Sequence, residues 1–442
     1  MPTPSRFYPA FLALAIFTIT AHAADPLLRL SLDRPEAIYE IGEKAVFTLH
    51  SNAPAGSEIT WKTSLDGFGS ISSGKITPDA GSPATVIGTL DRPGFFLISA
   101  TVKGAEGKPF IAHAAAAFDP GKIEPSLPVP EDFDGFWAEQ KKQLASVPLK
   151  PALVPVPMVS NDDAGIEAYD VSVPAASDGS PVTGYFAKPK AAAPKSLPAV
   201  LWVHGAGVRG SSLPTALGGA RDGFLSMDIN AHGLPNGKPD AYYKELSVGT
   251  LKSYIHQGKS SRETVYFRGM FVRLQRALDF LTSQPEWDGK ILAVIGHSQG
   301  GYQALVAGGL DPRVTFIGSG VPAGCDHTGM KAARISGWPK LVAMTASGVP
   351  TSDSLEASRY VDAVNFATRC KAEAILSVGF IDLTCPPTSV YAAYNVLRGP
   401  KSMLTRPAMG HAAPDDIKAE FRLALLKHAG KPVPSPLPAI VR

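Results

Sequence analysis

Residues 291–301 read Ile-Leu-Ala-Val-Ile-Gly-His-Ser-Gln-Gly-Gly, and this stretch decides the fold. The apolar run Ile291–Ile295 is typical of a strand that is buried on both faces. It leads directly into Gly-x-Ser-x-Gly, the pattern of a nucleophile elbow, and small residues continue beyond it. So tight a turn from strand to helix has room only for small residues two positions before and after the serine. The pattern predicts that Ser298 projects as a nucleophile above the carboxyl end of a buried strand.

The segments around this stretch alternate between strand and helix patterns. Residues 169–173 and 182–187 read as an antiparallel hairpin around a turn at Asp178-Gly179. Further strand patterns lie at residues 199–203, 224–228, 314–317, 374–378 and 402–404, and an apolar stripe from Phe267 to Leu281 has helical spacing. A hairpin that leads into parallel strands and helices is the order of the α/β-hydrolase fold. We therefore predict a doubly wound α/β-hydrolase domain over residues 131–430.

The chain before residue 131 has a different composition. Residues 24–118 show short alternating runs separated by turn residues, which predicts an immunoglobulin-like β-sandwich. A proline-rich linker is expected at 119–130, and the stripe that begins at Phe133 and Trp137 predicts a helix packed on the next domain. The proline-rich residues 431–442 are expected to be a disordered tail. All candidate catalytic residues lie beyond residue 200, so the β-sandwich is not expected to take part in the chemistry.

The first 23 residues resemble a signal peptide. Arg6 is followed by a mostly apolar stretch, and Ala21-His22-Ala23 is a small-x-small cleavage site. We expect export to the periplasm or the extracellular space; the alternative is an uncleaved anchor, but the apolar stretch is short for a stable membrane span. The net charge of +3 and the scattered lysines do not indicate nucleic acid as a partner.

The three cysteines do not form a disulfide framework. Cys325, Cys370 and Cys385 allow one disulfide plus a free thiol in an exported protein, or three thiols. No cluster of cysteine and histidine has the spacing of a zinc site, so we expect no metal.

A serine nucleophile needs a base and a residue that orients the base. In this fold the chain order is serine, then acid, then histidine. Asp382 follows the strand at 374–378, and His411 follows the last strand, so we predict that they act as acid and base with Ser298. His428 is an alternative base near the end of the chain, whereas His327 comes too early in this order.

The reaction also needs two backbone N–H groups that stabilise the oxyanion. One is expected at Gln299, directly after the nucleophile, and the other in the loop that begins at His204. Within that loop we predict Ala206 as the donor, with Gly205 as an alternative. His204 is expected to make structural hydrogen bonds and not to act as a second base.

Several further motifs stand together in one order. They are Phe133-Asp134-Gly135-Phe136-Trp137, Gly296-His297-Ser298-Gln299-Gly300-Gly301, Asp362-Ala363-Val364-Asn365-Phe366-Ala367, Asp382-Leu383-Thr384-Cys385-Pro386-Pro387, Ala392-Ala393-Tyr394-Asn395 and Gly410-His411. Over roughly residues 130–430 the chain resembles the acetyl xylan esterases of the cephalosporin-C deacetylase group, carbohydrate esterase family seven. The resemblance implies hydrolysis of acetyl esters on sugars, no cofactor, and a triad of Ser298, Asp382 and His411.

The chain departs from that family at two loops. Family members carry Arg-Gly-Gln after the strand that ends near Asp228, whereas the segment Asn230–Gly237 here reads Asn-Ala-His-Gly-Leu-Pro-Asn-Gly. Ala206 stands where the family has a tyrosine. The β-sandwich is an addition, and the closed hexamer of the family does not carry over automatically, so the oligomeric state stays open.

The sequence thus predicts a secreted serine carboxylesterase that acts on an acetylated sugar or oligosaccharide. One alternative is a broader serine esterase or peptidase of the same fold. Another is a non-enzymatic binding module on a degenerate hydrolase scaffold, which the intact set of Ser298, Asp382 and His411 argues against.

Overall fold

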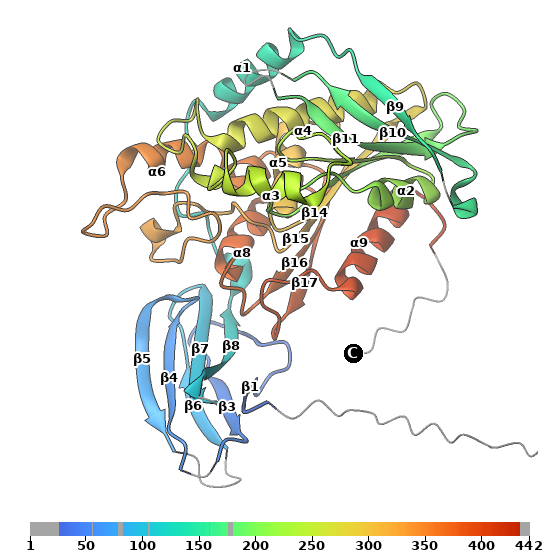
Figure 1. The fold of residues 1–442 in the computed structure, drawn as a ribbon. Coiled ribbons are helices and arrows are strands. Elements are labelled where there is room, and N and C mark those ends of the chain that lie inside the picture. Colours follow the sequence, from blue (N-terminus) through green and yellow to red (C-terminus); the bar gives the residue numbers. More distant parts are fainter. Residues whose placement is uncertain are drawn as a thin grey trace, which may run out of the picture.

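The computed structural model describes residues 26–54, 56–77, 83–104, 107–158, 160–175 and 180–433. These residues form an all-β N-terminal part and a larger α/β part (Figure 1). The predicted signal peptide and most of the predicted tail lie outside the described residues. Within them, no helix has both the length and the apolar character that a membrane span requires.

The N-terminal part consists of two sheets. The smaller has the order β1 (Leu28–Leu32), β3 (Ala45–Ser51), β6 (Ala84–Gly88), and the larger has the order β2 (Ile38–Tyr39), β8 (Pro109–Phe118), β7 (Gly94–Lys103), β4 (Ile59–Leu65), β5 (Phe68–Ile76). Alternate residues such as Phe47, Phe96 and Ile98 point inward and form one buried cluster. The all-β character is as predicted; its immunoglobulin-like assignment and the exact domain boundaries stay predictions.

The connector leads into the helix that the aromatic stripe predicted. A short 3-10 turn, η2 (Pro120–Lys122), precedes α1 (Phe133–Ala145). Phe133 and Trp137 are buried, and the Trp137 indole N–H donates to the Tyr360 carbonyl oxygen at 2.9 Å. The helix is therefore fixed on the α/β part, as expected.

The α/β part is built on a nine-stranded sheet among the described residues. Its order is β17 (Lys401–Arg406), β16 (Glu373–Gly379), β15 (Phe316–Gly320), β14 (Trp287–His297), β12 (Leu197–Val203), β13 (Leu225–Ile229), β11 (Val182–Pro189), β10 (Ile166–Val173), β9 (Ala152–Val156). From β17 to β13 neighbouring strands are parallel, and β11 pairs antiparallel with both β13 and β10. This is the α/β-hydrolase arrangement that the sequence predicts.

Helices cover both faces of this sheet (Figure 1). After α1, the helices of this part are α2 (Leu213–Arg221), α3 (Asp240–Val248), α4 (Tyr266–Thr282), α5 (Gln299–Leu310), α6 (Ser352–Arg359), α7 (Ala363–Ala367), α8 (Pro387–Val396) and α9 (Asp415–His428), with short 3-10 turns η3 (Asn161–Asp163), η4 (Tyr254–His256) and η5 (Gly329–Ala332). Because strand side chains alternate, Ile295 of β14 packs toward α9, whereas Val294 packs in the main core with α4 and α5. Both faces of β14 are thus buried, as its apolar run predicted.

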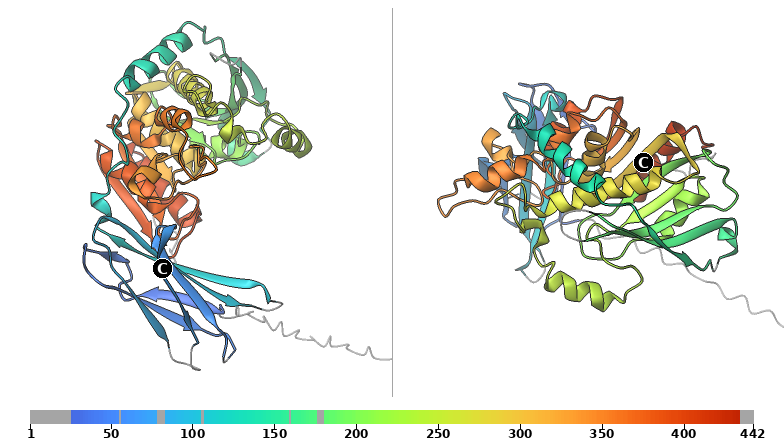
Figure 2. Two further views of the ribbon diagram at one scale, coloured as in Figure 1. Left: turned by 90° about the vertical axis from the view of Figure 1, so that its left-hand side faces the viewer. Right: turned by 90° about the horizontal axis from the view of Figure 1, so that it is seen from above.

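The two parts of the chain share one hydrophobic core. Phe95 and Leu97 of β7 belong to the same buried cluster as the α/β core. The Phe95 ring meets Phe380 edge-on, with 5.0 Å between ring centroids. Figure 2 shows the N-terminal sheets against the end of the α/β part that carries β16 and β17. The three cysteines are buried free thiols, so the disulfide that the sequence left open is not formed.

Candidate active site

Ser298 occupies the tight turn between β14 and α5. Its backbone has φ 58° and ψ −120°, a strained conformation that the elbow pattern predicts. The turn is held by the Ser298 N–H, which donates to the Gly320 carbonyl oxygen at 2.8 Å, and by the Ala323 N–H, which donates to the Ser298 carbonyl oxygen at 3.1 Å. Neighbouring loops therefore fix the backbone that presents the serine side chain.

The glycines on either side of Ser298 are required by close backbone contacts. A Cβ atom on Gly296 would lie 2.4 Å from the Val203 carbonyl oxygen, and one on Gly300 would lie 2.1 Å from the same atom. Real Cβ atoms do not approach so closely, and backbone cannot yield as a flexible side chain does. The steric reason for the elbow pattern is therefore present in this chain.

Ser298, His411 and Asp382 form one continuous hydrogen-bonded chain. His411 lies after β17 and Asp382 after β16, so both loops open at the sheet edge that carries Ser298. The Oγ atom of Ser298 is 2.9 Å from Nε2 of His411, and Nδ1 of His411 is 2.8 Å from Oδ2 of Asp382. With a proton on Nδ1, Nε2 is free to accept the serine proton.

Asp382 is held by its own loop. The side chain is fully buried, and its Oδ1 atom accepts hydrogen bonds from the N–H groups of Thr384 at 2.8 Å and Cys385 at 2.9 Å. Its Oδ2 atom is left for His411. A buried carboxylate with fixed partners can orient the imidazole and stabilise the imidazolium that forms when serine loses its proton.

The same region also contains donor atoms that a metal could bind. Among the described residues, Asp382, Cys385 and His411 each have a ligand-type atom within 4.8 Å of the others. However, Asp382 and His411 already hydrogen-bond to each other, and burial raises the pKa of the Cys385 thiol well above its usual range. Metals bind the thiolate and not the thiol. The donors therefore fit an acid–base pair better than a metal centre.

The expected oxyanion donors lie on either side of Ser298. Gln299 is the first residue of α5, so its N–H has no acceptor within the helix. Ala206 is exposed in the loop after β12. The loop passes close to the nucleophile, since a Cβ on the preceding Gly205 would be 3.6 Å from Cβ of Ser298. The arrangement leaves both Ala206 and Gly205 as candidates for the second donor.

The altered segment Asn230–Gly237 supports this loop from beneath. His232 is buried, with Nε2 3.1 Å from the Gly207 carbonyl oxygen and Nδ1 2.7 Å from the Tyr266 hydroxyl. Burial lowers the pKa of His232 to about 4, so the ring is neutral near pH 7. A neutral ring fits both contacts, because Nε2–H donates to Gly207 and Nδ1 accepts from Tyr266.

Tyr254 is a second support that the sequence did not reveal. Its hydroxyl donates to Oε1 of the fully buried Gln299 side chain at 2.5 Å, and its ring meets His232 edge-on at 4.6 Å. Tyr254 lies in the short turn η4, where no periodic pattern draws attention to it. The departure from the family pattern at residues 230–237 was the one sequence signal that pointed toward this region.

The three histidines that the sequence weighed beside His411 have structural partners. Nδ1 of His204 lies 2.6 Å from the Gly205 carbonyl oxygen, Nε2 accepts from the Ala231 N–H, and burial lowers its pKa to about 3. His428 is held between Glu373 and Thr315, and His327 is buried beside Tyr302. The structure therefore brings His411, and not these alternatives, to Ser298.

Comparison with known proteins shows what this chain is similar to. A family model described as acetyl xylan esterase matches residues 122–428. The chain is 30% identical to the acetyl esterase Axe7A of Xylanibacter ruminicola over 407 residues, and this alignment covers 90% of each protein. An alignment of that length includes some of the N-terminal β part.

Two solved structures are similar over nearly the whole of their own chains. An acetyl xylan esterase from Paenibacillus sp. R4 has 27% identity and a TM-score of 0.59, covering 70% of this chain and 98% of the other. Acetyl xylan esterase 1 from Thermoanaerobacterium sp. JW/SL YS485 has 24% identity and a TM-score of 0.56, covering 69% and 97%. At that identity the second likeness is one of fold.

Proposed function

This chain belongs to the acetyl xylan esterase family and is a carboxylic ester hydrolase, and we propose that it removes acetyl groups from acetylated carbohydrate through Ser298, His411 and Asp382. The observation that carries the mechanism is the continuous chain of hydrogen bonds from Ser298 Oγ through His411 to Asp382, at 2.9 and 2.8 Å. Nucleophile, base and orienting acid are within hydrogen-bond reach in the order that acyl transfer needs.

In the acylation step, Ser298 Oγ attacks the acetyl carbonyl carbon while His411 Nε2 takes the hydroxyl proton. Asp382 holds the imidazolium through Nδ1. The oxyanion is stabilised by the Gln299 N–H and by the second donor from the loop at Ala206. When the tetrahedral intermediate collapses, His411 gives its proton to the departing sugar oxygen, and acetyl-Ser298 remains.

In the deacylation step, His411 removes a proton from water, which attacks the acetyl-Ser298 carbonyl. The intermediate collapses to acetic acid, which carries the second water proton and loses it to solvent, and His411 returns the first proton to Ser298 Oγ. All groups are back in their starting state, and no step needs a cofactor.

A substrate panel tests the proposed specificity. The purified protein is assayed with an acetylated xylo-oligosaccharide, with acetate and butyrate esters of one aryl alcohol, and with a peptide. Overpacking a closed acyl pocket by two methylenes costs about 1–3 kcal/mol, so the acetate ester is expected to have a kcat/KM at least about tenfold above that of the butyrate ester. Equal rates for the two esters would indicate a broader esterase instead of a deacetylase. Cleavage of the peptide alone would indicate a peptidase.

We also propose that the protein is exported, because residues 1–23 have the pattern of a signal peptide. N-terminal sequencing of the mature protein is expected to begin near Ala24. Retention of Met1 in the cell extract would contradict export.

A further inference from the structure

The tip of the β4–β5 hairpin in the N-terminal part carries a buried aspartate. Leu65 pairs with Phe68, so Asp66 and Gly67 are the two turn residues, with φ of 54° and 88°. Positive φ at both positions belongs to a type I′ turn, for which Asp-Gly is a preferred sequence. Such turns lie at the surface, yet Asp66 is only 2% exposed. A buried carboxyl group is costly without a hydrogen-bond partner.

The partner of Asp66 is the first turn of α8 in the α/β part. Its Oδ2 atom accepts a hydrogen bond from the Thr388 N–H at 3.0 Å, across 322 residues of sequence. The helix begins at Pro387 after an N-cap Pro386, and prolines have neither an N–H nor a capping side chain. Thr388 therefore supplies the first free N–H of the helix. Asp66 takes the role of an N-cap residue from the other part of the chain.

The helix α8 begins where the loop of the proposed catalytic acid ends. Cys385, whose N–H holds Asp382, directly precedes Pro386. The hairpin tip also touches this loop, because a Cβ on Gly67 would be 3.4 Å from a methyl group of Leu383. On the other side of Asp382, Phe380 packs against Phe95 of the N-terminal part. The N-terminal part thus contacts the chain before, within and after the acid loop.

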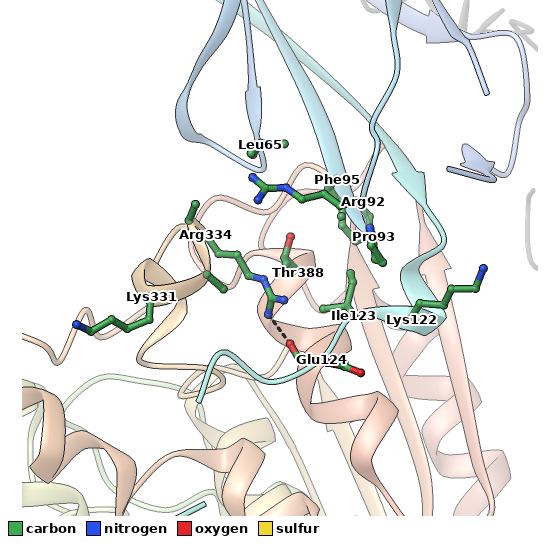
Figure 3. Close-up of a pocket in the computed structure, with 13 residues that line it drawn as sticks. Leu65, Arg92, Pro93, Phe95, Lys122, Ile123, Glu124, Lys331, Arg334 and Thr388 are labelled. Carbon is green, nitrogen blue, oxygen red and sulfur yellow. Dashed lines mark hydrogen bonds between the residues drawn. The ribbon is translucent and has the colours of Figure 1, made fainter. Parts of the chain in front are cut away.

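The start of α8 lies beside a cavity at the boundary between the two parts of the chain. Figure 3 shows a cavity between the two parts of the chain, with Leu65 and Phe95 on one side and Thr388 on the other. Its volume is about 620 Å³. Thr388 itself is buried, and Asp66 accepts its N–H across the boundary between the two parts of the chain. The Asp66–Thr388 hydrogen bond therefore joins the hairpin tip to the start of α8 at one defined point.

We propose that Asp66 is a positioning residue for the catalytic acid, acting through the first turn of α8 on the loop that holds Asp382. The proposal rests on the function proposed above. The sequence predicted no part for the N-terminal region in the chemistry, because nothing in it reveals a contact between a hairpin tip and a helix so far along the chain. The structure supplies that contact.

The charge state of Asp66 suggests a rescue variant. Burial, with a smaller contribution from the charge of Asp382, raises the pKa of Asp66 to about 8. Near pH 7 the group is therefore largely protonated and accepts the Thr388 N–H through a carbonyl-type oxygen. Asparagine has nearly the same shape and keeps such an oxygen, whereas alanine has no acceptor.

The test compares kcat and KM of full-length variants on an aryl acetate ester. D66A is expected to lower kcat about tenfold, because a small displacement of the acid misaligns His411, while KM changes less than about twofold. D66N is expected to keep kcat within about twofold of the wild type. The matched control is N395A at the other end of α8, where the Asn395 amide donates to the carbonyl oxygens of Pro120 and Ile123. N395A is expected to lower the melting temperature but leave kcat unchanged.

Two results would overturn the proposal: folded D66A with wild-type kcat, or an equal fall of kcat in N395A, which would mean a general loosening of the interface. If D66A does not fold, D66S takes its place with the same expected loss of kcat. Serine suits a turn, but its side chain is too short to reach Thr388. S298A is assayed in parallel. Activity remaining in S298A would refute the proposed function itself, whereas an inactive S298A beside a fully active D66A would refute only the role of Asp66.

Discussion

Two single residues, Tyr254 and Tyr266, support the two segments that carry the proposed oxyanion donors. Tyr254 holds the Gln299 side chain, and Tyr266 holds His232, which in turn binds the Gly207 carbonyl. Oxyanion stabilisation depends on donors that are already in place before charge develops. We therefore propose that these hydrogen bonds contribute to catalysis by keeping two backbone segments fixed.

Replacing Tyr254 by phenylalanine removes one hydroxyl and no packing. The Gln299 Oε1 atom then loses its donor, while Nε2 of the same side chain has no partner among the described residues even in the native protein. An unpaired buried amide costs about 1–3 kcal/mol, and a part of that cost reaches the Gln299 N–H. We expect Y254F to lower kcat about three- to tenfold with little change in KM, measured on an aryl acetate ester.

The control for this variant is Y169F. The Tyr169 hydroxyl donates to Glu167 on β10, in the antiparallel part of the sheet. This variant is expected to keep the wild-type kcat. A wild-type kcat in Y254F, or the same loss in both variants, would show that the Tyr254 hydroxyl does not support the site.

Single residues also show where sequence reasoning succeeds. Ser298, Asp382 and His411 were predicted to lie together because each follows a recognisable strand and strand ends in a parallel sheet meet at one edge. The structure brings them within hydrogen-bond distance, and their catalytic roles stay predictions. Tyr254 and His232 follow no such rule, since irregular loops between the strands bring them together. Their contacts are set by tertiary packing and not by a local pattern.

At the scale of elements, long periodic segments were predicted well and short ones were not. The strand β14 and helices α4 and α5 agree with their apolar patterns. By contrast, β15 begins at Phe316 and not at Val314, because the Val314 N–H is taken by the Asp311 carbonyl in the turn after α5. The edge strand β9 and the five-residue helix α7 were missed, since an exposed edge and a single helical turn carry little pattern.

The contact between the β4–β5 hairpin and α8 makes stability depend on pH. The pKa of Asp66 rises from its usual 3.8 to about 8 in the folded protein. Between these values the folded state keeps a proton that the unfolded state has lost, so the free energy of unfolding falls as pH rises. The amide of D66N does not titrate. We expect the wild type to lose at least about 1 kcal/mol relative to D66N between pH 5 and pH 8, measured by urea unfolding.

Other buried carboxyl groups, such as Asp228 with a pKa raised to about 7, add the same slope to both proteins and cancel in the comparison. Parallel curves for wild type and D66N across this range would show that Asp66 titrates near its usual pKa. A steeper fall in D66N would contradict the sign of the argument.

At the scale of the whole molecule, the two parts of the chain form one continuous structure. The sequence predicted an all-β part, a connector and an α/β part, because each has its own composition. It did not predict the shared core around Phe95 or the contact of the hairpin tip with the acid loop. Interfaces between distant segments depend on complementary shape, which leaves no period in the sequence. The sequence pattern therefore predicted the sheets, but it did not predict that the N-terminal part contacts the loop that holds Asp382.

The role of Ser298 as the nucleophile is tested by the kcat of S298A on an acetylated substrate, compared with that of the wild type. Members of a catalytic triad act as a unit, so loss of the nucleophile is expected to lower kcat by roughly 10³-fold or more. Circular dichroism and the melting temperature are expected to match the wild type, because only a half-buried hydroxyl is removed. A correctly folded S298A that retains a tenth of the wild-type kcat would show that Ser298 is not the nucleophile.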